Sequence, residues 1–265
     1  MAQRSNFRRQ PESRMFTGEC PIHGEIARSE VEQFDGSMLV RPCKQCQFRG
    51  LRVAAVGSSE HSQALAHLSA ERVNSALVGS GITPRFAGSM FANYRVDNSA
   101  MGQALAICQG YANDFEDHYR AGRNLLLCGN VGTGKTHLAS SIVQQVVRQL
   151  GAVAVITSAA EIIRVFKGSM DRDAGYSERD VIAELADLDL LVIDEVGAQA
   201  GTAYELAMLH EVFDRRYQLV RPTVVVSNMD AKGLGQYIGE RALDRLRENK
   251  ALLAGFTWDS ERRRA

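Results

Sequence analysis

The sequence predicts an α/β fold in which a parallel sheet carries a phosphate-binding loop and a small metal-binding module precedes it. Three observations lead to this prediction. An apolar run from Leu125 to Cys128 leads into G-x-x-x-x-G-K-T at Gly129 to Thr136. A second apolar run ends in the acidic pair Asp194-Glu195, and two C-x-x-C/H pairs lie near the start of the chain. Together they indicate a nucleotide site and a structural metal site.

Length and composition fit one large globular domain with a smaller attachment. The 265 residues are 45% hydrophobic and 23% charged, and the formal net charge is zero. This composition excludes a disordered chain, and the lack of a run of about 18 apolar residues argues against a membrane protein. No apolar signal sequence follows the N-terminal arginines, so we expect a cytoplasmic protein. Any contact with nucleic acid must come from local basic patches.

The chain divides into four expected segments. Residues 1–16 are polar and rich in arginine, which predicts a flexible tail or, alternatively, an arm that contacts nucleic acid or a partner. Residues 17–50 are expected to form the metal-binding module, residues 51–80 a helical stalk and linker, and residues 81–265 the ATPase domain. The last boundary falls where glycine and proline interrupt the helical pattern, at Gly79 to Pro84.

Four residues near the N-terminus are candidate metal ligands, namely Cys20, His23, Cys43 and Cys46. Each pair can lie on a tight turn that directs both side chains to one ion, and the segment between the pairs is long enough for a hairpin. Four ligands leave no open position, which predicts structural zinc. A module this small cannot bury a sufficient core, so the metal would supply most of its folding energy. The alternative is a set of unrelated buried thiols.

The glycine-rich loop predicts a site for ATP. Its glycines let successive backbone N–H groups face the phosphates at the positive end of the following helix. Lys135 is expected to reach the β- and γ-phosphates, and the Thr136 hydroxyl to bind Mg²⁺. The residues expected to contact the nucleotide are Gly129, Asn130, Val131, Gly132, Thr133, Gly134, Lys135, Thr136 and His137.

Polar residues that follow the later strands are expected to meet this loop, because ligands bind at the carboxyl ends of strands in open α/β sheets. Asp194 is expected to hold Mg²⁺ together with the threonine of the loop, and Glu195 to polarise the attacking water. Asn228 is a candidate sensor of the γ-phosphate. Arg241 and Arg245 share one face of a predicted helix, which fits either a solvated face or residues that reach a neighbouring subunit's nucleotide.

Several motifs resemble those of the DnaC-type AAA+ helicase loaders of bacteria and their phages. The resemblance lies in GNVGTGKTHL at 129–138, LLVIDEVG at 190–197, Ser227-Asn228-Met229, GERALDRLR at 239–247 and Trp258-Asp259-Ser260. It covers most of the chain after the glycine-rich linker. It implies an AAA+ P-loop NTPase core with a parallel five-stranded sheet and no C-terminal lid domain, behind the small zinc-binding and helical module.

The resemblance also implies partners and roles. It makes Arg245, and after it Arg241, a candidate arginine finger that acts across the contacts of a homo-oligomer, and places a weak candidate second sensor at Arg262. It implies that the chain binds single-stranded DNA and, through its N-terminal module, a hexameric replicative DNA helicase. Candidate DNA contacts by this resemblance are Lys167, Arg172, Thr202 and Tyr204. The cysteine and histidine cluster departs from the purely helical helicase-binding segment of many members.

Three functions therefore compete. The first is an ATPase that loads a helicase onto single-stranded DNA during replication initiation. The second is an IstB-type ATPase that regulates a transposase on duplex DNA, and the zinc module and the lack of an obvious duplex-reading element favour the first over it. The third is an enzyme with a small-molecule substrate, which predicts a substrate lid and gives the paired arginines no role.

Overall fold

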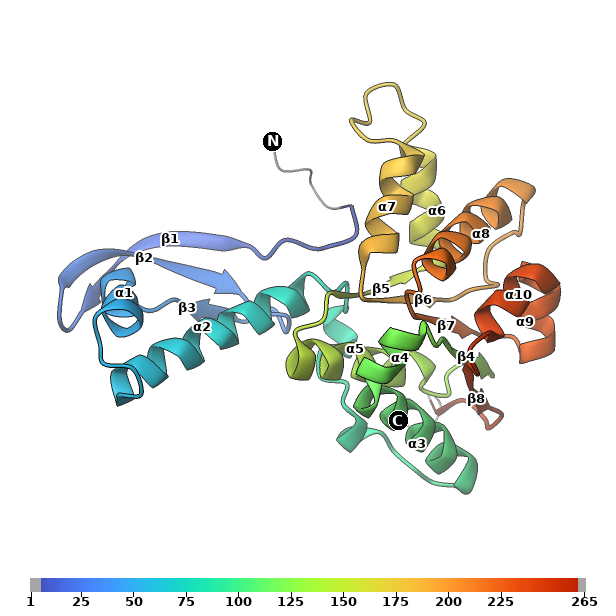
Figure 1. The fold of residues 1–265 in the computed structure, drawn as a ribbon, viewed down its shortest axis with the longest axis horizontal. Helices are drawn as coiled ribbons and strands as arrows, with labels where there is room; N and C mark the ends of the chain where they lie inside the picture. The colour runs from blue at the N-terminus through green and yellow to red at the C-terminus, as the bar shows by residue number, and fades with distance from the viewer. Residues whose placement is uncertain (1–5, 262–265) are drawn as a thin grey trace.

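The structure is a computed structural model that describes residues 6–261 and consists of an extended arm joined to an α/β core (Figure 1). The arm contains a three-stranded antiparallel sheet in the order β1-β2-β3, followed by two helices. Arg262, named above as a candidate second sensor, lies outside the described residues. The arm elements are β1 (Ser13–Cys20), β2 (Gly24–Glu32), β3 (Met38–Val40), α1 (Lys44–Arg52) and α2 (Ser59–Val78).

The helix α2 connects the arm to the core. Ser58 caps its N-terminus by accepting a hydrogen bond from the backbone N–H of His61 at 3.2 Å, and the helix ends at Gly79. The next residues run against the edge of the core sheet, where the N–H of Ile156 donates to the carbonyl of Ser80 at 2.8 Å. Gly81 has a φ of +76°, and a Cβ there would lie 2.3 Å from the Ile156 carbonyl oxygen, so this crossing requires glycine.

The N-terminal segment differs from the flexible tail expected over residues 1–16. Strand β1 begins inside it and pairs with β2 along its whole length, with Ser13 opposite Val31. Before β1, Phe7 is buried against the core, and the backbone N–H groups of Asn6 and Phe7 donate to the carboxylate of Glu184. Backbone pairing and the burial of one aromatic ring therefore order this segment from residue 6 onward, because each removes chain freedom that a solvated tail would keep.

The core contains the predicted five-stranded parallel sheet, with strand order β5-β6-β7-β4-β8. The phosphate-loop strand β4 is therefore flanked by the strand that precedes Asn228 and by the last strand of the chain. Its position away from either edge explains its uninterrupted apolar sequence. The strands are β4 (Leu125–Gly129), β5 (Ala154–Ser158), β6 (Leu190–Asp194), β7 (Thr223–Ser227) and β8 (Leu252–Phe256).

Successive side chains of these strands point to opposite faces of the sheet and belong to two separate apolar clusters. Leu125 and Leu127 pack with α3 and α5 on one face, whereas Leu126 and Cys128 pack with α6 to α10 on the other.

Among the described residues, no helix is both long and apolar enough to cross a lipid bilayer. The core helices are α3 (Ser99–Asn113), α4 (Phe115–Ala121), α5 (Lys135–Leu150), α6 (Ala159–Gly168), α7 (Glu178–Asp187), α8 (Ala203–Gln218), α9 (Ala231–Ile238) and α10 (Glu240–Arg247), and the short 3-10 turns are Pro84–Phe86 and Phe91–Asn93.

Candidate functional site

The phosphate loop turns from β4 into α5 through glycines in backbone conformations that other residues rarely adopt. Gly129, Gly132 and Gly134 have φ values of +133°, +75° and +91°. A Cβ on Gly129 would lie 2.2 Å from the carbonyl oxygen of Phe256, and one on Gly134 would lie 2.7 Å from the ring of Tyr94. The glycines therefore provide both the turn and the close approach of neighbouring segments.

Lys135 lies at the N-terminus of α5 with its side chain folded against the loop. It is 5% exposed, and its Nζ donates to the carbonyl of Gly129 at 2.9 Å and also to the carbonyl of Asn130. A largely buried ammonium beside the N–H groups of a helix start forms a positively charged cradle. The donor set present fits the phosphates of a nucleotide.

The structure brings the two residues expected to hold Mg²⁺ into direct contact. The Thr136 hydroxyl donates to Oδ2 of Asp194 at 2.8 Å, although the two residues are 58 positions apart. Burial raises the pKa of the Asp194 carboxyl above its ordinary value, while the hydrogen bond from Thr136 opposes that rise. A desolvated carboxylate beside a hydroxyl suits a hard divalent cation with oxygen ligands, which would offset the cost of its burial.

Glu195 and Asn228 reach the same cavity from neighbouring strands. Glu195 has a left-handed φ of +58°, and its N–H donates to Oδ1 of Asp194 at 2.7 Å. This conformation is unfavourable for a non-glycine residue. Both residues line a cavity of about 450 Å³ together with the loop from Val131 to His137.

The wall of this cavity also contains residues to which the motifs give no role. Tyr94 and Arg95 come from the segment before α3, and Glu261 follows β8. The sequence marks the first of these segments only as an irregular aromatic stretch, because none of these residues belongs to a motif of fixed spacing. Contacts between segments far apart in the chain place them at the loop.

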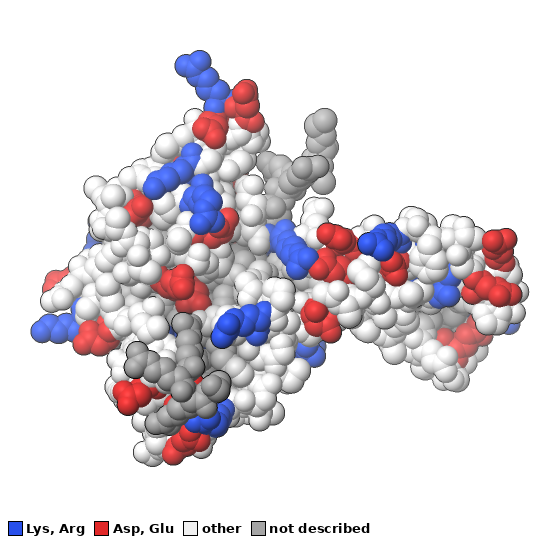
Figure 2. Space-filling model, turned by 180° about the vertical axis from the view of Figure 1, so that it is seen from behind, with Lys and Arg blue, Asp and Glu red and all other residues white. Residues whose placement is uncertain are grey.

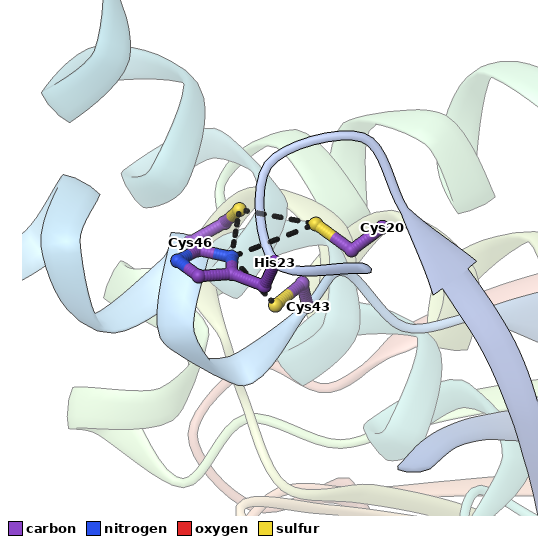
Figure 3. Close-up of side chains that lie close together, drawn as sticks. All are labelled: Cys20, His23, Cys43 and Cys46. Atoms are coloured by element: carbon purple, nitrogen blue, oxygen red, sulfur yellow. Dashed lines mark hydrogen bonds between the residues drawn. The ribbon is translucent and has the colours of Figure 1, made fainter. Parts of the chain in front are cut away.

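The four predicted metal ligands converge in the arm, as Figure 3 shows. Sγ of Cys20 and Sγ of Cys46 are 3.7 Å apart, and Nδ1 of His23 lies 3.4 to 3.6 Å from the sulfurs of Cys20, Cys43 and Cys46. A tetrahedral zinc ion with Zn–S of about 2.3 Å and Zn–N of about 2.0 Å separates its ligand atoms by about 3.7 Å between sulfurs and about 3.5 Å between sulfur and nitrogen. The donor set therefore has the size and chemistry of a closed zinc site.

Local structure explains how the ligands meet. Cys20 and His23 flank the tight turn between β1 and β2, whereas Cys43 precedes α1 and Cys46 lies in its first turn. Backbone N–H groups, that of Ile22 foremost, lower the pKa of Cys20 to about 6 and so favour the thiolate that metals bind.

The candidate arginine fingers lie on α10, and neither lines the cavity of its own chain. Arg241 is exposed. Arg245 is about one fifth exposed, pairs with Asp214 of α8 and places its guanidinium 5.7 Å from the centre of the Tyr217 ring. A role in nucleotide hydrolysis would therefore require another subunit and the release of Arg245 from these contacts.

Three of the candidate DNA contacts have partners within the chain. Lys167 lies 3.3 Å from Glu205, whose carboxylate also takes part in the capping box with Thr202 at the start of α8. The Tyr204 hydroxyl donates to Glu178 at 3.0 Å, and its ring packs against a core cluster. The fourth, Arg172, is exposed between α6 and α7. Figure 2 shows basic and acidic side chains interspersed on one face of the molecule.

The chain matches known proteins over most of its core. The family model of the IstB-like ATP binding protein matches residues 112–254. The replicative helicase loader DnaC of Escherichia coli K12 is 35% identical over 185 residues, which cover 70% of this chain and 74% of that protein. DnaC of Buchnera aphidicola from Acyrthosiphon pisum is 32% identical over 69% of this chain and 73% of that protein. A crystal structure of the DnaC helicase loader superimposes with a TM-score of 0.59 at 19% identity, covering 65% of this chain and 98% of that one.

Proposed function

The chain belongs to the family of IstB-like ATP-binding proteins and DnaC-type helicase loaders, and from this premise we propose that it is an ATP-dependent loader of the replicative DNA helicase. In this role it binds the helicase and places it on single-stranded DNA when replication begins. The observation that carries the proposal is the 35% identity to a protein named replicative helicase loader, spread over 70% of this chain.

The nucleotide site supplies the energy for this cycle. Lys135 would contact the β- and γ-phosphates once its ammonium leaves the loop carbonyls, and Thr136 and Asp194 would hold Mg²⁺. The metal would neutralise charge that develops on the phosphate oxygens. Glu195, at the end of the neighbouring strand, would polarise a water for displacement at the γ-phosphate, with the Asn228 amide positioning that water.

We expect hydrolysis to need a second copy of the chain. Arg245 is the first candidate for a residue that stabilises the transferring phosphate of a neighbour, and Arg241 is the second. Arg245→Ala should leave nucleotide affinity unchanged and remove the stimulation of hydrolysis by single-stranded DNA, as measured by phosphate release. Arg247→Ala, on the exposed surface of the same helix, is the matched control. If single-stranded DNA stimulated hydrolysis equally in the two variants, Arg245 would have only a structural role beside Asp214.

The zinc-binding arm is the proposed handle for the helicase, since it extends away from the core (Figure 1). DNA is expected along α6 and the start of α8. Exposed Lys167 and Arg172 would contact phosphate there, and the ring of Tyr204 would offer a face for stacking beside the capping residue Thr202.

The decisive experiment tests whether the protein associates with a replicative helicase. The purified protein should form a stable complex with the host's hexameric helicase in size-exclusion chromatography, and a chain lacking residues 1–78 should lose it while still binding nucleotide. The matching family model is named for the IstB-like ATP binding protein, and the alternative function is the regulation of a transposase. Binding to a transposase together with duplex DNA, and none to the helicase, would favour that alternative.

A further inference from the structure

The phosphate loop is held from both sides by segments that the nucleotide motifs do not include. One segment, Tyr94 to Asp97, lies between the second 3-10 turn and α3. The other, Thr257 to Glu261, follows β8 and closes the described part of the chain. We call the two segments together the clasp. Both contribute to the wall of the nucleotide cavity.

The later segment binds the first half of the loop. The side-chain amide of Asn130 donates to the carbonyls of Thr257 and Trp258 at 3.1 and 3.0 Å. The backbone N–H of Glu261 donates to the carbonyl of Gly132 at 2.9 Å. Three hydrogen bonds therefore fix the path of this segment relative to the loop.

The earlier segment covers the second half of the loop. The Tyr94 hydroxyl donates to the carbonyl of Thr133 at 3.0 Å, and its ring fills the space in which Gly134 has no side chain. Burial raises the pKa of the Tyr94 hydroxyl, so it remains a protonated donor at neutral pH. The ring also lies 5.5 Å from that of His137, between centroids.

An ion pair joins the two segments. A guanidinium nitrogen of Arg95 lies 2.6 Å from Oε2 of Glu261, although the residues are 166 positions apart. Nε of Arg95 also lies 2.7 Å from Oδ2 of Asp97, which belongs to the same segment as Arg95. Arg95 thus has one acidic partner across the clasp and one beside it.

We propose that the ion pair between Arg95 and Glu261 keeps the clasp closed over the phosphate loop and thereby sets the rate at which bound nucleotide leaves. The proposal rests on the nucleotide site of the proposed function. Tyr94, Arg95 and Glu261 line the cavity that the loop also lines, and the two segments bond to the carbonyls of successive loop residues, Gly132 and Thr133. Opening the pair removes the direct side-chain link between the two segments.

Release of fluorescently labelled ADP, chased by excess unlabelled ADP in a stopped-flow instrument, tests the clasp without hydrolysis, DNA or helicase. Glu261→Gln keeps the backbone bond to Gly132 and removes the charge, so release should be about fivefold faster, the upper end of the range for a partly exposed ion pair. Asp97→Asn removes an equal charge from the same arginine and should leave the release rate within about 1.5-fold of the original.

Charge reversal provides the second test. Arg95→Glu alone should speed release at least as much as Glu261→Gln, and the double variant Arg95→Glu with Glu261→Arg should restore slow release. If ADP binds normally but leaves Glu261→Gln and the original protein at the same rate, the clasp proposal is wrong and the nucleotide site stands. Failure of the original protein to bind labelled ADP would overturn the nucleotide site, and the proposed function with it.

Discussion

The arm and the core are stabilised by different means. In the core, two apolar clusters on opposite faces of the sheet bury residues from every strand. In the arm from Ser13 to Val56, the buried apolar residues are Cys20, Val31 and Cys43, and two of these three are candidate metal ligands. The core is stabilised by apolar burial distributed over many residues, whereas the arm has few buried apolar residues and we expect it to depend on one closed metal site.

Removal of the metal should therefore destabilise the arm far more than the core. A strong chelator should unfold β1 and β2, because structural zinc contributes about 10–16 kcal/mol to small zinc modules. Amide hydrogen exchange should accelerate in the arm, while the affinity of the core for nucleotide stays the same. Cys43→Ser should reproduce the loss, and Cys108→Ala, at a buried core cysteine, should retain about one zinc per chain. An arm that keeps slow exchange without metal would contradict this dependence.

Within the core, the largest effect of a single substitution is expected at Arg216. Its guanidinium is buried and donates to the carbonyls of Leu185, Leu188 and Pro222, and burial lowers its pKa to about 9. Arg216→Leu leaves these acceptors unpaired and should lower the free energy of unfolding by about 3–5 kcal/mol. The loss is measured by unfolding in denaturant, monitored by the fluorescence of the core. Arg215→Leu, which changes the exposed neighbouring arginine, is the control.

The Arg216 variant also tests whether the regions are independent. Its zinc content should equal that of the original protein, since the arm ligands do not contact this helix. Loss of zinc on destabilising the core would show that the arm depends on the core for its folding.

A smaller effect, confined to function, is expected at Lys135. Lys135→Ala removes a charge-assisted contact to phosphate and should weaken ATP binding by roughly 100-fold, or about 2.7 kcal/mol, measured by calorimetry. The exposed Lys232→Ala provides a control with the same change of charge. An unchanged ATP affinity in Lys135→Ala would show that the loop is not part of the nucleotide site.

The smallest effect is expected from one hydroxyl at the loop. Tyr94→Phe keeps the ring over Gly134 but loses the hydrogen bond to Thr133, which should cost about 1 kcal/mol and raise the ADP dissociation constant about fivefold. Tyr176→Phe loses a similar bond, to the carbonyl of Val165 at 3.2 Å, away from the loop. Equal affinities of the two variants would confine the role of Tyr94 to packing.

Much of the fold and part of the site follow from sequence pattern. The five core strands are short apolar runs, and the four candidate metal ligands and the residues from Gly129 to Thr136 lie at fixed spacings that require one local geometry. The pairing of Thr136 with Asp194 follows from a general rule, since the carboxyl ends of parallel strands meet at one edge of the sheet. The expected flexible tail was wrong from residue 6 onward, because Phe7 is buried by helices that lie far away in the sequence.

The sequence by itself determined the strands of the core, the order of the motifs and the chemistry expected at the two sites, since these depend on residue type and short spacing. Only the tertiary structure decided that Arg95 meets Glu261 over the loop and that Arg245 lies beside Asp214. The physical reason is that such contacts join polar side chains from segments that lie far apart in the sequence. They carry no periodicity, and their partners are selected by how distant parts of the chain pack.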